Sequence, residues 1–192
     1  MKTIGIIGGT FDPPHLGHLI IAQEVLESFS LDEVWFMPSA IPPHKDREDI
    51  LDAELRQEML ERAISAHPQF KISTIEFERS GKSYTIDTMK QLIEKYPNTQ
   101  FYFLIGGDMI DSLHTWHEIE QLLELVQFIG LKRPGYTSKG RYSHRILEID
   151  VPQIDISSSM IRERIRAGKS IRYFVPEQVR TYIEMRGLYG AK

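Results

Sequence analysis

The chain has 192 residues, 41 % of them hydrophobic, so it can bury one good core and has close to the usual size of a single domain. Its formal net charge of −4 argues against a protein that coats nucleic acid or an anionic membrane, because such binding depends on many Lys and Arg side chains meeting phosphates. The absence of cysteine excludes disulfides, thiolate catalysis and cysteine-based zinc sites, and it fits a reducing compartment.

Predicted strands and helices alternate along the chain. Apolar β-branched runs predict buried strands, and apolar residues three and four apart predict helices. The expected strands are 2–7, 34–37, 70–77, 101–105, 128–132 and 146–151, and the expected helices are 17–29, 52 to about 67, 86–95, 119–125, 158–166 and 176–185. Asp52 is the expected N-cap of the second helix, and Gly187 is the expected C-cap of the last.

This alternation predicts an α/β fold, because a parallel sheet built in this way is covered by helices on both faces. We expect a Rossmann-like, doubly wound parallel sheet in a single domain over residues 1–192, with a small C-terminal helical part over about 152–192. Residues 1–9 contain too short an apolar run for a signal peptide, and no stretch approaches the roughly 20 apolar residues of a membrane span. We therefore expect a cytoplasmic protein that does not bind membranes.

The first candidate site follows the first predicted strand. Gly8 and Gly9 end that strand, where a turn into a helix can direct backbone N–H groups at a phosphate, although an ordinary tight turn has the same glycines. His15 and His18 are three apart at the helix entry, so both imidazoles can face the turn and bind phosphate or a metal. A zinc site needs more ligands, and a histidine pair alone is more often structural. Its place beside the glycines and the Asp-Pro-Pro turn favours a ligand site.

The second candidate site lies at the start of a C-terminal helix. Ser157, Ser158 and Ser159 can cap its free N–H groups, and capping alone would explain them. Arg162, however, lies in the first turns, where a cation is unfavourable beside the positive end of the helix dipole. A bound phosphate would remove that conflict, although Glu163 could also balance part of the charge. The hydroxyls, N–H groups and guanidinium together favour a phosphate cradle.

Both motifs resemble the signatures of one nucleotidyltransferase superfamily, which contains the nicotinate-mononucleotide and phosphopantetheine adenylyltransferases. Residues 8–18 (GGTFDPPHLGH) resemble the first signature, and residues 156–162 (ISSSMIR) resemble the second, with Ser159 in place of a threonine. The resemblance implies that His15 and His18 contact the phosphates of ATP and stabilise charge as the adenylyl group moves. It also implies that Ser157, Ser158 and Arg162 hold the β- and γ-phosphates.

The middle of the chain resembles the nicotinate-mononucleotide adenylyltransferases in particular, through PPHK at 42–45, SYTIDT at 83–88, GGD at 106–108, WH at 116–117 and KRPG at 132–135. The resemblance assigns Lys45, Thr85 and Trp116 to the acceptor. The resemblance makes His15, His18 and Arg162 the catalytic residues. The ATP-binding residues that it implies are Gly8, Gly9, Thr10, Phe11, Gly106, Asp108, Arg133, Ser157 and Ser158.

The residues themselves leave alternatives open in the middle of the chain. Lys45 can be a solvated loop lysine, and Thr85 can be an N-cap. Trp116 can stack on a pyridine ring, but tryptophan is commonly a core residue. Asp108 can bind a ribose hydroxyl or a magnesium-bound water, or it can cap a helix. Arg133 can contact the nucleotide or form a surface salt bridge.

The resemblance implies adenylyl transfer from ATP to nicotinate mononucleotide, which yields nicotinate adenine dinucleotide and pyrophosphate for NAD biosynthesis. We expect Mg²⁺ as cofactor, held mainly by the phosphates of ATP and not by a protein metal site. We expect ATP and nicotinate mononucleotide as partners, no nucleic acid, and leave a homo-oligomer open. The alternatives are the same chemistry on nicotinamide mononucleotide or phosphopantetheine, and a nucleotide-sensing module without turnover. A nucleic-acid-binding domain is disfavoured by the charge.

Overall fold

The chain folds around a parallel sheet. The structure, a computed structural model, describes residues 1–39, 50–78, 84–132, 140–152 and 154–191, and of Asp108 only the backbone. Its six strands lie in the order β3-β2-β1-β4-β5-β6, and every neighbouring pair is parallel. The strands are β1 (Lys2–Gly9), β2 (Glu33–Pro38), β3 (Phe70–Ile72), β4 (Thr99–Gly106), β5 (Gln127–Lys132) and β6 (Ile146–Asp150).

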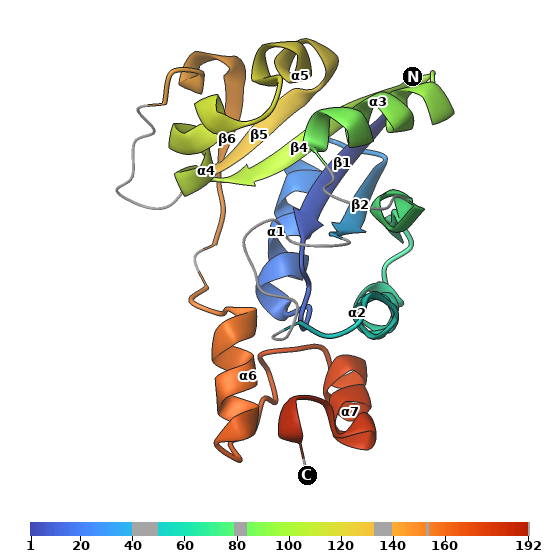
Figure 1. The fold of residues 1–192 in the computed structure, drawn as a ribbon, viewed down its shortest axis with the longest axis vertical. Coiled ribbons are helices and arrows are strands. Elements are labelled where there is room, and N and C mark those ends of the chain that lie inside the picture. Colours follow the sequence, from blue (N-terminus) through green and yellow to red (C-terminus); the bar gives the residue numbers. More distant parts are fainter. Residues whose placement is uncertain (40–49, 79–83, 133–139, 153, 192) are drawn as a thin grey trace.

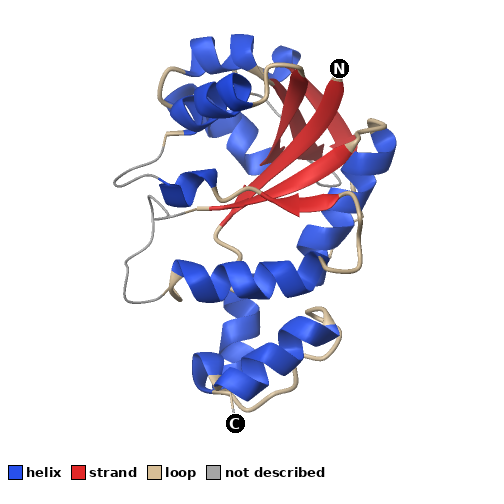
Figure 2. Cartoon of the chain, turned by 90° about the vertical axis from the view of Figure 1, so that its right-hand side faces the viewer, coloured by secondary structure: helices blue, strands red, loops and turns tan. Residues whose placement is uncertain are grey.

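Helices cover both faces of this sheet, as Figure 2 shows. The α-helices are α1 (Leu16–Ser28), α2 (Ala53–Ile64), α3 (Thr85–Lys95), α4 (Gly107–Ser112), α5 (Ile119–Leu125), α6 (Ser158–Arg166) and α7 (Glu177–Arg186). The 3-10 helices are η2 (Ile75–Glu78), η3 (Leu113–Thr115), η4 (Ser143–Arg145) and η5 (Leu188–Gly190). In Figure 1, α6 and α7 lie together below the sheet, near α2 and the lower end of α1. The predicted doubly wound α/β fold is therefore confirmed.

Two apolar clusters form the core, one on each face of the sheet. Successive side chains of a strand point to opposite faces, so Ile4 and Ile6 of β1 belong to one cluster and Ile7 to the other. Helices α3, α4 and α5 pack on the first face, whereas α1, α2, α6 and α7 pack on the second. The C-terminal helices therefore share a continuous core with the sheet.

The predicted strand over 70–77 is wrong beyond residue 72. β3 is an edge strand that pairs only with β2, and this pairing ends at Ile72. β2 continues to Pro38, but the chain leaves its edge after Ser73, whose N–H donates to the carbonyl of Phe36 over 2.9 Å. The residues that follow make no strand pairing with β2. They form η2 instead, in which Ile75 still enters the core.

Two smaller expectations also need correction. Helix α4 was not predicted, because its six residues begin with a glycine and are too few to show a period. Asp52 occupies the N-cap position of α2, but its side chain makes no capping hydrogen bond. Gly187 is confirmed as the C-cap of α7, with the left-handed φ of 60° that favours glycine. Within the described ranges, we find no helix that is both long and apolar enough to cross a membrane.

Candidate active site

The candidate site lies where the winding of the sheet changes direction. β1 pairs with β2 on one side and with β4 on the other, so the connections leaving these strands run to opposite sides. Ligands of open α/β sheets bind outside the carboxyl ends of the strands at such a point. β1 ends at Gly9, and β4 ends at Gly106, which is the N-cap of α4. Gly8, Gly9, Thr10 and Gly106 are therefore brought to one edge.

The turn after β1 is tight because a phenylalanine ring fills the space beside a glycine. A Cβ on Gly9 would lie 3.0 Å from the ring of Phe11, whose own φ of 51° is left-handed. That ring is buried against Phe36, at 5.8 Å between centroids, and meets the edge of His18 at 4.9 Å. The Phe11 side chain thus supports the turn from the core side. Whether Phe11 also contacts a nucleotide stays a prediction.

The two histidines of the first motif are stacked. Their ring centroids are 3.7 Å apart with an interplanar angle of 24°. The backbone N–H of His15 donates to Nδ1 of His18 over 3.2 Å. A neutral imidazole has one donor and one acceptor nitrogen, so this bond places the proton of His18 on Nε2. His18 can therefore donate from Nε2 to a phosphate oxygen.

Burial keeps both imidazoles neutral in the unliganded protein. It lowers the pKa of His15 from 6.5 to about 4. The pKa of His18 is also lowered well below its usual value, first by burial and second by repulsion from His15. At neutral pH the pair consequently supplies hydrogen-bond donors without a full charge, and fixed positive charge has to come from other residues.

The second motif supplies a guanidinium and docks directly onto the first. Nη1 of Arg162 donates to the carbonyl of Asp12 over 2.8 Å, and Nη2 donates to Oγ of Ser159 over 3.3 Å. The hydroxyl of Ser158 donates to the carbonyl of Pro13 over 2.8 Å. Ser157 is the N-cap of α6, and its Oγ accepts the N–H of Met160. The balancing carboxylate is Asp12, 4.0 Å from Arg162, where the sequence had suggested Glu163.

Buried polar atoms without a hydrogen-bond partner collect at this junction. Four side-chain atoms in the described part of the chain have this property, and three of them belong to the two motifs: Oδ2 of Asp12, Nδ1 of His15 and Nε of Arg162. Buried polar groups in native proteins are normally satisfied, so each exception calls for an explanation. A phosphate that binds here could accept from Nε of Arg162, and from Nδ1 of His15 if that nitrogen is protonated, but it cannot partner Oδ2 of Asp12 because both groups are acceptors.

The segments predicted to bind the acceptor also come together. Thr85 is the first residue of α3, but Tyr84 occupies the N-cap position, so the alternative of Thr85 as N-cap is wrong. The ring of Tyr84 lies 4.4 Å from that of His117, next to Trp116. Trp116 is partly buried against Phe103 and Phe128, each at 6.1 Å between ring centroids. The alternative of Trp116 as a core residue is therefore confirmed.

Three further predicted residues cannot be placed fully. Lys45 and Arg133 lie outside the described residues. Asp108 is the second residue of α4, one place inside the helix and not its cap, and its side chain is not described.

Comparison with known proteins assigns the chain to a family. Residues 6–164 match the model of the cytidylyltransferase-like family. The chain is 52 % identical over 189 residues to the nicotinate-nucleotide adenylyltransferase of Bacillus subtilis, covering 98 % of this chain and 99 % of that protein. It is 54 % identical over 192 residues to a Geobacillus kaustophilus protein named "Probable nicotinate-nucleotide adenylyltransferase", covering 100 % of this chain and 88 % of that one. The chain belongs to the nicotinate-nucleotide adenylyltransferase family.

A solved structure of a nicotinic acid mononucleotide adenylyltransferase has the same fold. The Plasmodium falciparum enzyme, complexed with NaAD, superimposes with a TM-score of 0.83 at 23 % identity, over 100 % of this chain and 99 % of that one. At this identity the likeness concerns the fold alone. The likeness extends over the whole chain, the C-terminal helices included.

One buried residue of this family member was missed by the sequence analysis. The side chain of Arg56 in α2 is among the largest that are fully buried. Its Nε donates to the carbonyl of Leu51, and its Nη1 donates to those of Thr10 and Ser39, all at 2.9 Å. Arg56 therefore ties α2 to the turn after β1 and to the end of β2. Its spacing from Met59 places it on the apolar face of the helix, which was an available signal.

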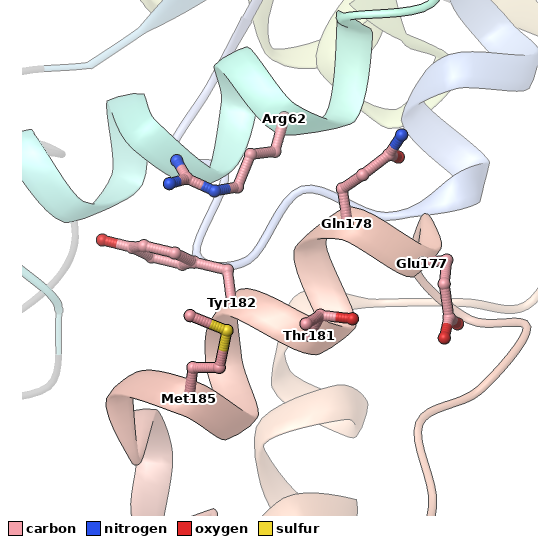
Figure 3. A pocket seen from close by; sticks show the side chains of 6 residues that line it. All are labelled: Arg62, Glu177, Gln178, Thr181, Tyr182 and Met185. Carbon is pink, nitrogen blue, oxygen red and sulfur yellow. The ribbon is translucent and has the colours of Figure 1, made fainter.

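A surface hollow of about 250 Å³ lies away from these motifs, between α2 and α7 (Figure 3). The guanidinium of Arg62 stacks 4.1 Å from the ring centre of Tyr182 and donates to the carbonyl of Glu58. Glu177 accepts from Arg180 at 2.9 Å. The charged side chains of this hollow are thus paired within the protein, so it differs from the junction of the two motifs, where buried polar atoms lack partners. The lining side chains are Arg62, Glu177, Gln178, Thr181, Tyr182 and Met185.

Proposed function

We propose that this protein transfers the adenylyl group of ATP to nicotinate mononucleotide, giving nicotinate adenine dinucleotide and pyrophosphate for NAD biosynthesis. Membership of the nicotinate-nucleotide adenylyltransferase family supports the reaction and the acceptor. The observation that carries the proposal is the junction of the two motifs, where two hydrogen bonds of 2.8 Å join chain segments about 150 residues apart. This junction joins the segment that carries the neutral imidazole pair to the segment that carries the guanidinium.

The reaction is a displacement at phosphorus. A phosphate oxygen of the acceptor attacks the α-phosphorus of ATP and forms the new P–O bond. The bond from the α-phosphorus to the bridging oxygen breaks, and its electron pair leaves with pyrophosphate. The acceptor phosphate is already anionic at neutral pH, so no strong general base is needed. Catalysis comes from alignment and from stabilising the developing charge.

The described residues suit that task. His18 can donate a neutral N–H from Nε2, and Arg162, which donates to the carbonyl of Asp12 in the same motif, supplies a fixed positive charge. Free N–H groups at the start of α6, where Ser157 is the N-cap, add a positive dipole end that favours the β- and γ-phosphates. His15 stacks on His18, and it takes part directly if the triphosphate raises its pKa.

The residues of this site suit magnesium that is bound to ATP. Among the described residues there is no group of three or more His, Cys, Asp or Glu side chains that could hold a metal ion. The junction offers imidazole and guanidinium N–H donors, whereas Mg²⁺ prefers oxygen ligands and keeps several waters. We therefore propose that Mg²⁺ is held by the phosphates of ATP, where it neutralises charge on the leaving pyrophosphate.

The assignments in the middle of the chain remain part of the proposal. Thr85 and Trp116 would contact the acceptor, which the meeting of Tyr84 with His117 supports because it brings the two segments together. Lys45 would meet the acceptor phosphate. Asp108 and Arg133 would lie on the ATP side, and the place of Asp108 at the end of β4 is compatible with this.

The test is pyrophosphate release from ATP and magnesium with one acceptor at a time: nicotinate mononucleotide, nicotinamide mononucleotide or phosphopantetheine. We expect strong turnover with the nicotinate form and a loss of at least about a hundredfold in His18→Ala, the scale of one lost transition-state donor. His144→Ala, which removes an exposed imidazole of η4, is the matched control. Turnover with another acceptor only would correct the substrate, and tight ATP binding without any turnover would support a nucleotide sensor.

A further inference from the structure

Asp12 presents a conflict inside the first motif. Its side chain is 1 % exposed and lies at a junction that we propose to bind phosphates, so its negative charge opposes the ligand. Oδ2 of Asp12 is 4.0 Å from Nη1 of Arg162, whereas a hydrogen-bonded pair of this kind lies at about 2.7–2.9 Å. The carboxylate thus stops roughly one ångström short of closing on the guanidinium.

A tyrosine from the far end of the chain holds the carboxylate in that position. The hydroxyl of Tyr189, in η5, donates to Oδ1 of Asp12 over 2.6 Å, across 177 residues of sequence. Burial and the adjacent carboxylate raise the pKa of Tyr189 above its usual range, so this hydroxyl keeps its proton and remains a donor.

The backbone of Tyr189 is strained in making this contact. Its φ of 57° and ψ of 15° are left-handed, and Gly187 and Gly190 on either side are left-handed too. A bulky residue in this region is unfavourable and persists only where its surroundings hold it there. The hydroxyl also lies 3.9 Å from Sδ of Met59, a weak acceptor, so the carboxylate is its strong partner.

We propose that Tyr189 is a positioning residue for ATP binding: by holding Oδ1 of Asp12, it prevents the carboxylate from pairing directly with Arg162. Without the hydroxyl, Nη1 of Arg162 is a donor that the buried carboxylate can reach by moving about one ångström. Such a pair would occupy the guanidinium and reduce its attraction for a phosphate. This rests on the proposed function, since it assumes that Arg162 meets the phosphates of ATP.

The test compares ATP affinity in two tyrosine variants by titration calorimetry with magnesium and no acceptor. Tyr189→Phe keeps the ring and removes only the hydroxyl. Tyr142→Phe is the matched control, because its hydroxyl also donates to a carboxylate, that of Glu120, over 2.6 Å, and its ring is buried on the opposite face of the sheet. We expect Tyr189→Phe to raise the Kd for ATP on the order of tenfold, and Tyr142→Phe to leave it unchanged.

Two further readouts separate positioning from a purely structural role. In steady-state kinetics, Tyr189→Phe should raise the KM for ATP and leave the KM for the acceptor unchanged. In an Asp12→Asn background, loss of the hydroxyl should no longer weaken ATP binding, because the competing charge is gone. An unchanged Kd in Tyr189→Phe, or an equal loss in the Asp12→Asn background, would overturn the proposal.

Two outcomes keep the test decisive. If Tyr189→Phe does not fold, Asp12→Asn alone should bind ATP at least as tightly as the wild type. Weaker binding there would mean that the carboxylate supports Arg162 and does not compete with the ligand. If the wild type shows no turnover with any acceptor, the proposed function fails, but the ATP titrations still decide the role of Tyr189.

Discussion

Acid should destabilise the unliganded protein through His15. Burial holds the pKa of His15 at about 4, against 6.5 for a solvated imidazole. Between these values the unfolded chain binds a proton at this position and the folded chain does not, so the free energy of unfolding falls as the pH is lowered. Each pH unit in that window is worth about 1.4 kcal/mol. The loss is therefore about 2 kcal/mol between pH 7 and pH 5, and about 3 kcal/mol once the pH reaches 4.

Urea unfolding at a series of pH values, without ATP, measures this loss against a variant that cannot titrate there. His15→Gln replaces the imidazole with a neutral polar side chain, and its difference from the wild type cancels the carboxylates common to both. That difference should change by about 2 kcal/mol from pH 7 to pH 5, with the wild type losing more. His144→Gln, at an exposed position, is the control for loss of an imidazole. Parallel curves for wild type and His15→Gln would refute the reasoning.

Three further predictions concern the charges at the junction. Arg162→Lys keeps the charge but cannot reproduce the bonds to Asp12 and Ser159, so kcat/KM in pyrophosphate release should fall about a hundredfold. ATP binding should take up protons below about pH 7, because an anionic ligand raises the depressed pKa values of the two histidines. Calorimetry in buffers of different ionisation enthalpy measures this uptake. An equal heat of binding in all buffers would contradict the prediction. Arg56→Met leaves three carbonyls without their donor and should lower the free energy of unfolding by about 3 kcal/mol or more in urea titration, with exposed Arg166→Met as control.

Most of the fold could be predicted from the sequence, because the patterns that predict a strand or a helix involve only neighbouring residues. The apolar run that forms β1 and the helical spacing of α1 both depend on neighbouring residues, and the bounds agree with the structure to within two residues. The predicted end of the third strand was wrong. Its residues 73–77 have strand-like character, but the pairing stops at Ile72 although β2 continues to Pro38. The local pattern does not say where an edge strand leaves its partner.

The candidate site could also be predicted only in part. That the two motifs meet could be expected from the resemblance, and the place of Gly8 and Gly106 follows from the rule for parallel strands. The contacts among buried side chains could not be expected, because no local pattern links Tyr189 to Asp12. Arg56 gave a partial signal, a charged residue on an apolar helix face, but its carbonyl partners depend on the fold.

At the phosphate site that we propose, the charge of the buried Asp12 carboxylate has to be outweighed by positive charge. Arg56 and Arg162 both lie near Asp12, so these three side chains have an excess of one positive charge, with both histidines neutral, and Asp52 offsets part of the charge of Arg56. This excess of one charge is small against a triphosphate. If ATP binds here as proposed, the remaining stabilisation would come from groups that adapt: N–H dipoles, magnesium that arrives with ATP, and protons taken up by the histidines. The proposed site would then attract ATP without holding pyrophosphate too firmly, since magnesium and protons could leave with the product.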